Sequence, residues 1–200
     1  FITNLDRWGV MALIATASYH QAKALRDSFY RYLAFEGYIG VTIPASPSYF
    51  HLSFDLPFYA WRKARPHRPP CDFRTKSDNG PLRHVTDLSF LQRTTTSPLQ
   101  TETDYLCEAQ VSVSIVGCDN WRWIAYCFTY HDEMEDEDGL SGGLQCDPLT
   151  AGEHDANQPL LTPREYFLRV LEVRLRQVRD EWLEVVRNMR HRVHEYVRCS

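Results

Sequence analysis

The last forty residues of the chain carry a complete helix start signal. Thr162 is a favourable N-cap, because its hydroxyl can accept a hydrogen bond from a free backbone N–H of the first turn. Pro163 falls at the first helical position, where its missing N–H costs nothing. Glu165 can reach back to the amide of Thr162 and complete a capping box, with Leu161 and Tyr166 beside it at the positions of a hydrophobic staple. A helix that begins at Pro163 is therefore predicted.

An apolar stripe with a period of 3.5 residues follows this start. Its members alternate in steps of three and four: Leu168, Leu171, Leu175, Val178, Trp182, Val185 and Met189. We call these residues the predicted seam, because this period keeps one stripe of a helix facing a partner helix. A helix from Pro163 to Arg198 has a length of roughly 50 Å at about 1.5 Å per residue.

Two arrangements are compatible with so long a helix. It can pack along a sheet as a core helix, or it can project as a stalk or coiled-coil arm. We favour a mixture, in which the first half packs on the body and the second half projects. This interpretation divides the chain into an α+β globular domain, residues 1–160, and a stalk-like amphipathic helix, residues 161–200. It predicts self-association, or binding of a partner helix, through the seam.

The rest of the chain combines helices with antiparallel strands. Ser18 and Gln21 have the spacing of a second capping box, ahead of an amphipathic stretch that Gly37 is placed to end. Residues Tyr49 to Phe58 alternate in polarity, as a half-buried strand does. Gly9 to Thr16 is apolar and fits either a buried strand or part of a helix.

The clearest β signal is a hairpin. Its strands are predicted at Cys107–Val116 and Trp121–Tyr130, with the turn at residues 117–120. The return strand is apolar on both faces, so we expect it to be central in its sheet. Together these elements predict an α+β fold, with a mixed or antiparallel central sheet flanked by helices and a long C-terminal helix.

Composition places the chain among globular proteins. Of its 200 residues, 44% are hydrophobic and 13% are aromatic, which is enough apolar material for a core. It contains no run of about 18 apolar residues that could cross a membrane. The formal net charge of −4 argues against binding to nucleic acid. The six cysteines form no C-x-x-C pair, and we expect a reducing, intracellular location.

The candidate metal site is the acidic stretch at residues 131–138. Dense carboxylates attract hard cations such as Mg²⁺, the one cofactor that the sequence suggests. The candidate ligands are Asp132, Glu133, Glu135, Asp136, Glu137 and Asp138. An EF-hand register fails, because with Gly139 at the sixth position Met134 and Gln145 fall at ligand positions. A solvated acidic loop is the simpler interpretation.

A catalytic signature is not found in the sequence. Residues 139–143 match the G-x-S-x-G pattern, but a nucleophile elbow needs a buried strand before it, and here an acidic run precedes it. His191 and His194 lie three apart on the predicted helix without a third ligand nearby in sequence. P-loop, dinucleotide-binding and H-E-x-x-H motifs are absent. We therefore expect no catalytic residues and no enzymatic activity.

Several segments resemble, in order, the soluble region of the fungal CorA-like magnesium transporter family. They include Phe50-His51-Leu52-Ser53-Phe54-Asp55-Leu56-Pro57-Phe58-Tyr59-Ala60-Trp61-Arg62, Trp121-Arg122-Trp123-Ile124-Ala125-Tyr126-Cys127-Phe128, Asp147-Pro148-Leu149-Thr150 and Pro163-Arg164-Glu165-Tyr166-Phe167-Leu168. The similarity covers roughly residues 49 to 190. Such transporters carry two membrane helices and a Gly-Met-Asn pore signature after a long stalk helix. This sequence contains neither, so no residue here is assigned a role in a pore.

The resemblance implies a cytosolic regulatory and oligomerisation domain of a divalent-cation transport protein, with its stalk beginning at Pro163. It also implies a location on the cytoplasmic side of a membrane, a membrane portion outside this chain, and a role for the acidic stretch in binding regulatory Mg²⁺. The alternative is a stand-alone intracellular interaction module without catalytic activity, which binds a partner helix through the seam.

Overall fold

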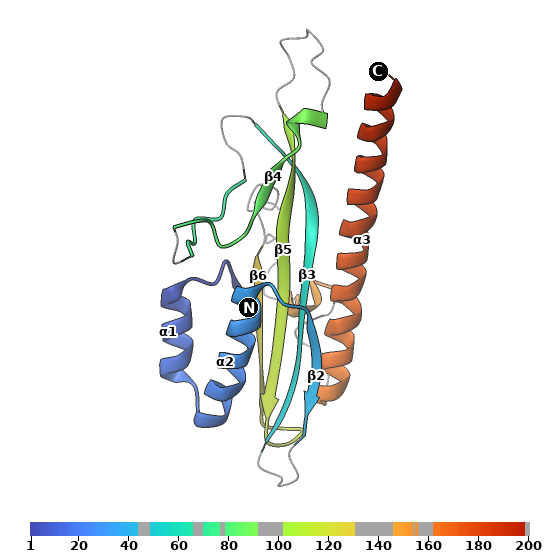
Figure 1. The fold of residues 1–200 in the computed structure, drawn as a ribbon. Coiled ribbons are helices and arrows are strands. Elements are labelled where there is room, and N and C mark those ends of the chain that lie inside the picture. Colours follow the sequence, from blue (N-terminus) through green and yellow to red (C-terminus); the bar gives the residue numbers. More distant parts are fainter. Residues whose placement is uncertain are drawn as a thin grey trace. The chain divides into compact units, whose positions relative to one another are not determined.

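The computed structural model describes residues 1–43, 49–65, 70–76, 79–91, 102–130, 146–153, 155 and 162–198. Within them the helices are α1 (Arg7–Thr16), α2 (Tyr19–Ala34) and α3 (Pro163–Arg198), shown in Figure 1. The strands are β1 (Ile2–Thr3), β2 (Tyr38–Thr42), β3 (Phe50–Ala64), β4 (Val85–Asp87), β5 (Thr103–Gly117) and β6 (Trp123–Tyr130). Two short 3₁₀ turns are η1 (Ser89–Leu91) and η3 (Pro148–Thr150). This architecture confirms the predicted α+β fold with its long C-terminal helix.

The strands form one mixed sheet. Their order is β1-β6-β5-β3-β2, and β4 pairs with β5 beside this path. β5 and β6 are antiparallel, with Val113 opposite Cys127, and β2 and β3 are antiparallel, with Gly40 opposite Ser53. β1 runs parallel to β6. β6 therefore has a strand on each side, as its two apolar faces predicted, whereas β2 stands at one end of the order.

The chain divides into two compact units. Unit 1 comprises Phe1–Pro57 and Gln110–Gln177, and unit 2 comprises Phe58–Ala109 and Val178–Ser200. β3, β5 and α3 each contribute residues to both units. This division differs from the predicted one at residue 160, because the long helix belongs partly to each unit. An independent role for residues 161–200 stays a prediction.

Local signals explain where α1 and α2 begin and end. The ambiguous apolar stretch near the N-terminus is helical, with the carboxylate of Asp6 accepting from the N–H of Gly9 at 2.7 Å. The predicted capping box of Ser18 is present at the start of α2. That helix ends at Ala34 and not near Gly37, because Phe35 takes the left-handed conformation (φ 57°, ψ 40°) that glycine usually supplies.

The predicted hairpin is present, with one correction at its turn. β6 begins at Trp123, so Trp121 lies in the turn and is largely exposed. The carboxylate of Asp119 accepts hydrogen bonds from the backbone N–H groups of Trp121 and Arg122 at 2.9 and 2.8 Å. These bonds fold the chain at residues 119–122 and delay the return strand by two residues.

Unit 1 has helices on both faces of its part of the sheet (Figure 1). The face toward α3 is apolar, and its buried cluster includes Leu52, Phe54, Val111, Val113, Ile115 and Cys127 of the sheet with Phe167 and Val170 of the helix. Toward α2, a smaller cluster joins Leu25, Phe29 and Tyr32 to Phe128 and Tyr130. Alternation along β6 thus sends Cys127 to one core and Phe128 to the other.

Unit 2 has smaller apolar clusters. One contains Phe58, Ala60 and Ala109, with Val178 of α3 packed against them. A second contains Trp61, Leu88 and Val185, with Met189 packed against it. The part of α3 in this unit is therefore attached to the unit's own strands at two successive places along the helix.

Candidate functional site on the C-terminal helix

α3 begins where the sequence predicted, with a small difference in its cap. The hydroxyl of Thr162 accepts from the N–H of Glu165 at 3.3 Å, as an N-cap does. That hydroxyl also donates to the Glu165 carboxylate at 2.6 Å, whereas the capping box had placed this carboxylate on the amide of Thr162. The helix is continuous to Arg198, and its 36 residues span roughly 54 Å.

In unit 1 the inner side of α3 is deeply buried. Tyr166, Phe167, Val170 and Val173 are each no more than 9% exposed, and the rings of Phe167 and Phe54 lie 5.7 Å apart. The hydroxyl of Tyr166 donates to the Asp147 carboxylate at 2.7 Å. Burial and this hydrogen bond raise the pKa of Tyr166, so the phenol stays protonated and remains a donor.

A buried arginine joins α3 to the segment before it. Arg174 is 4% exposed, and its guanidinium donates to the backbone carbonyl oxygens of Leu149 at 2.9 Å and Pro148 at 2.6 Å. The Asp147 carboxylate caps this turn by accepting from the N–H of Leu149 at 3.0 Å. The chain from Asp147 to Leu149 is thus held by hydrogen bonds from Tyr166 and Arg174 of the helix.

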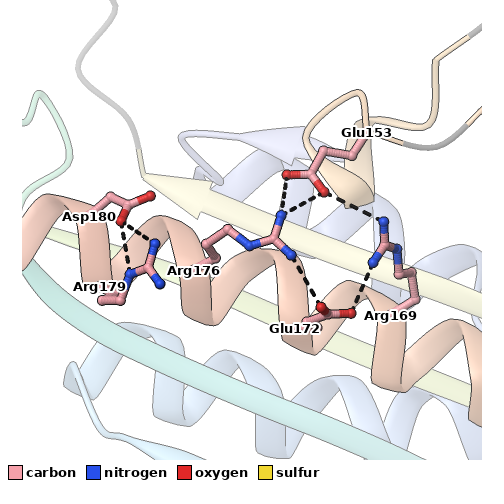
Figure 2. Close-up of polar contacts among 6 residues, drawn as sticks. All are labelled: Glu153, Arg169, Glu172, Arg176, Arg179 and Asp180. Carbon is pink, nitrogen blue, oxygen red and sulfur yellow. Dashed lines mark hydrogen bonds and ion pairs between the residues drawn. The ribbon is translucent and has the colours of Figure 1, made fainter.

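A surface network lies on the outer side of the same turns (Figure 2). Glu153 accepts from Arg176 at 3.0 Å and lies 3.7 Å from Arg169. Glu172 pairs with both of these arginines, at 2.9 Å to Arg169 and 3.2 Å to Arg176. All four side chains are well exposed, so each pair contributes little free energy by itself. The network therefore links Glu153 to α3 and adds little to stability.

Unit 2 also holds its part of α3 by charge pairs. The carboxylate of Glu181 in α3 accepts hydrogen bonds from two guanidinium N–H groups of Arg62, at 2.8 and 3.0 Å. Arg192 donates to one oxygen of the Asp104 carboxylate at 2.8 Å, and the indole N–H of Trp61 donates to the other at 3.2 Å. The Asp104 side chain is 3% exposed, so this contact is largely shielded from solvent.

The covered side of α3 does not follow the predicted seam. Buried or half-buried side chains recur at Pro163, Phe167, Val170, Arg174, Gln177, Glu181, Val185, Asn188 and Arg192. These steps average 3.6 residues, the period of a straight α-helix. A stripe with a 3.5-residue period drifts about 20° per heptad across such a helix. The seam therefore begins on the exposed side and reaches the covered side further along.

The seam residues accordingly have different environments. In unit 1, Leu168 and Leu175 are 63% and 44% exposed, and Leu171 is partly buried against the core. In unit 2, Val178, Val185 and Met189 pack in the unit's own clusters, as described above. Trp182 is 42% exposed, with one ring edge toward Tyr59 at 5.8 Å. The structure does not bring the seven side chains onto one surface.

A different set of apolar residues lies together on the exposed side of α3 in unit 2. We call Trp182, Val186, Val193 and Val197 the α3 stripe; their exposed fractions are 42%, 60%, 45% and 65%. Their spacing of four, seven and four residues puts them on one side of an α-helix. Leu183 and Tyr196 flank the stripe and are also exposed. Sequence reasoning missed Val186 because it followed the 3.5-residue period; the 3.6-residue period was the signal that could have found it.

A polar cluster under α2 was not predicted. His51 and Ser114, from β3 and β5, meet at 2.9 Å between Nε2 and Oγ, and Arg31 of α2 donates to the Asp55 carboxylate at 2.6 Å. Gln110 and Ser112 continue the polar face along β5, with 3.3 Å between them. The alternation of polar residues along β3 and β5 was a signal for this polar face. No local sequence feature indicated that His51 and Ser114 would meet.

Burial tunes the titratable groups of this cluster. Burial, and next the positive charge of Arg31, lower the pKa of His51 to about 4, so this imidazole is neutral at pH 7. Burial raises the pKa of Asp55, while hydrogen bonds from Ser112 and Arg31 oppose that rise. Ser114 is completely buried, so a substrate cannot reach its hydroxyl in this arrangement. The cluster supports the attachment of α2 to the sheet.

The predicted metal ligands lie outside the described residues. In the part of the chain that the structure describes, no group of three or more His, Cys, Asp or Glu side chains is placed to hold a metal ion. His191 and His194 are exposed, and His191 lies 3.4 Å from Glu195. His191 therefore lies beside a carboxylate on the surface of α3. The metal site in the acidic stretch stays a prediction.

The described helices do not include one that is both long and apolar enough to cross a membrane. Comparisons with known proteins give no assignment for the chain: no family model, no curated protein and no solved structure matches it.

Proposed function

We propose that this protein is an association module, without catalytic activity of its own, that binds a second copy of the chain through the α3 stripe. The observation that carries the proposal is an ordered helix with apolar side chains on its outer side, while its inner side is already covered. Large exposed apolar groups in a line are typical of protein–protein contacts. Because the helix is already ordered, association costs little further conformational entropy.

A second copy is the occupant that best fits the pattern of the stripe. The spacing of four, seven and four residues reads the same in both directions along the helix. When two copies lie antiparallel, Val186 faces Val193 of the other copy and Trp182 faces Val197. The flanking Leu183 then meets Tyr196. Each contact occurs twice, which is the self-complementary arrangement that a two-fold dimer requires.

A wider proposal concerns the protein in which this module acts. We place it in the cytosolic regulatory and oligomerisation domain of a CorA-like magnesium transport protein, on the cytoplasmic side, with a membrane portion outside this chain. Its support is the ordered series of similar segments between residues 49 and 190 and the long helix that begins at Pro163. The alternative, a stand-alone interaction module, uses the same α3 stripe.

The metal part of the wider proposal has its own experiment. Calorimetric titration of the chain with Mg²⁺ should give heat that disappears when Asp136 and Asp138 are both replaced by Asn, because carboxylates supply the hard oxygen ligands that Mg²⁺ prefers. A wild-type chain that gives no heat up to millimolar Mg²⁺ would reject a regulatory metal site there. Neither result bears on the α3 stripe.

The α3 stripe is tested by sedimentation equilibrium of the 200-residue chain. The wild type should show a mass that rises above 23.4 kDa with concentration. The V186Q/V193Q variant, named here the stripe variant, should dissociate at least about tenfold more readily, because two apolar contacts become polar at the centre of the interface. Both side chains are exposed in the single chain, so its fold should be unchanged.

The matched control is E184Q/H191Q. It changes two exposed residues on the same turns of α3, roughly 120° or more around the helix from each stripe residue. This control should associate as the wild type does. The proposal fails if the stripe variant and the control have the same mass profile as the wild type, or if the control loses association as well.

A further inference from the structure

β2 is an open edge of the sheet in unit 1. It pairs with β3 on one side, and within the described residues no strand pairs with its other side. Ile39 and Val41 are 56% and 59% exposed, and Ile43, just after the strand, is 59% exposed. Such an edge offers a row of unpaired backbone N–H and C=O groups to another extended chain.

The edge also lacks the usual features that prevent pairing. Natural edge strands are protected by lysines, prolines, bulges or inward-pointing charges. β2 reads Tyr-Ile-Gly-Val-Thr and contains no charged residue and no proline, and its register with β3 is regular from Tyr38 to Thr42. A second uncharged strand therefore meets no electrostatic repulsion at this edge.

The two faces of β2 differ in what they can offer a partner. On one face, the Tyr38 ring lies over Gly40, so closely that a side chain at Gly40 would collide with it. The guanidinium of Arg31 stacks on that ring at 4.1 Å, which ties Tyr38 to its own unit. On the other face, Ile39 and Val41 lie opposite Phe54 and Leu52 of β3, and at the end of the sheet order they remain more than half exposed. The β-branched face is thus the one available for contact.

The strand is complementary to itself. When two copies of β2 run antiparallel with Gly40 opposite Gly40, Ile39 of each copy lies opposite Val41 of the other. Tyr38 then lies opposite Thr42. Pairs of β-branched residues across an antiparallel ladder are favourable, and the two glycines leave room for the two tyrosine rings at the centre.

We propose that β2 pairs edge to edge with β2 of a second copy of this chain, so that the sheets of two copies join into one antiparallel sheet centred on Gly40. This interface differs from the α3 stripe in location and in chemistry, because backbone hydrogen bonds hold it. It does not depend on the α3 stripe, and either interface can exist without the other.

The test uses charge exchange on β2 in the background of the stripe variant, so that association through α3 does not mask the result. The I39K/V41K variant places lysine opposite lysine at both paired positions, and the I39E/V41E variant places glutamate opposite glutamate. Each variant alone should lose at least about tenfold in self-association measured by sedimentation. Mixed in equal amounts, the two should associate with each other, because lysine then faces glutamate at both positions.

The matched control is I39T/V41T, which keeps β-branched side chains without charge and should still associate. Two outcomes overturn the proposal: lysine and glutamate variants that associate as their parent does, or variants that lose association and do not recover it when mixed. If the charged variants lose their far-UV circular dichroism, amide exchange of the parent decides. The exchange rates of the β2 amides should then fall as the protein concentration rises. Exchange rates that do not depend on concentration overturn the proposal.

Discussion

The two units hold the same helix in different ways. In unit 1, α3 is a core element: Phe167 and Val170 are buried against the sheet, and Arg174 is inserted among backbone carbonyls. In unit 2, Val185 is the one buried apolar side chain of α3 among the described residues, and Glu181 and Arg192 add ion pairs to the contact. One continuous helix is thus packed at its beginning and clamped by charges at its end.

The two kinds of attachment predict different local stabilities for the two parts of α3. Buried apolar area contributes about 25 cal/mol per Å², whereas the attraction in a largely buried ion pair is offset by the desolvation of its two charges. The part of α3 in unit 2 should therefore open more easily than the part in unit 1. The α3 stripe lies on that less stable part, so association with a second copy would stabilise the portion of the helix that its own unit holds less tightly.

The largest expected effect comes from the part of α3 that is packed in unit 1. Phe167→Ala should lower the free energy of unfolding by about 3–5 kcal/mol, since the ring is buried against Phe54 and its loss leaves a cavity. Val185→Ala in unit 2 should cost about 2 kcal/mol, because it removes a smaller side chain from a smaller cluster. Urea denaturation followed by circular dichroism measures both. Equal losses would contradict the contrast between the units.

Loss of the ion pair between Arg192 and Asp104, which we call the charge clamp, should give the next largest effect. Arg192→Met leaves the buried carboxylate of Asp104 without its cation, at a cost of about 2 kcal/mol. The D104N/R192M double variant should be less destabilised than the single variant, because the buried carboxylate that would lack its cation is then also removed. If the double variant is the less stable of the two, the clamp acts through packing and not through charge.

Unit 1 should carry a distinct pH dependence through His51. Its pKa is about 4 in the fold, below the ordinary 6.5, so the unfolded chain binds more protons between these values. Stability from this group is complete above about pH 6.5 and falls as the pH decreases toward 4, by about 2 kcal/mol after allowance for partial exposure. The nearby Arg31 and Asp27 act on this pKa in opposite directions.

A His51→Gln variant isolates that contribution. The difference in unfolding free energy between wild type and variant should shrink as the pH falls from 7 to 4, measured by urea denaturation at each pH. The pKa of Asp55 is raised in both proteins. Its effect on stability has the opposite sign, because protonation of Asp55 at low pH removes a buried charge. A difference that stays constant over this range would show that His51 does not titrate as described.

The smallest effect is expected from the surface network of Figure 2. Arg176→Met removes its ion pairs with Glu153 and Glu172, but all three side chains are exposed, and the cost should be about 0.5 kcal/mol or less. This variant is also the control for Arg192→Met, because both remove an ion-paired arginine from α3. A loss as large as that of Arg192→Met would mean that exposure does not govern the strength of these pairs.

Local patterns predicted the elements well. The caps of Ser18 and Thr162, the alternation along β6 and the continuity of the helix from Pro163 follow from neighbouring residues, which one sequence displays. The end of α2 was mislocated, because Phe35 occupies a backbone conformation that its sequence does not signal.

Contacts between segments distant in the chain were harder to predict from the sequence. The seam and the covered side of α3 differ by a tenth of a residue in period, a small angle per turn that accumulates over the length of the helix. Only the position of the sheet shows that Leu168 is exposed whereas Val185 is buried. The cluster of His51, Ser114 and Arg31 joins three elements distant in sequence, and nothing local reports such a meeting.

Hydrogen–deuterium exchange along α3, at two protein concentrations, tests most directly the claim that this helix is packed at one end and available for association at the other. At low concentration, amides of residues 167–177 should exchange more slowly than those of residues 186–198. At high concentration the second group should slow in the wild type and not in the V186Q/V193Q variant. Equal protection of both groups, unchanged by concentration, would contradict the account.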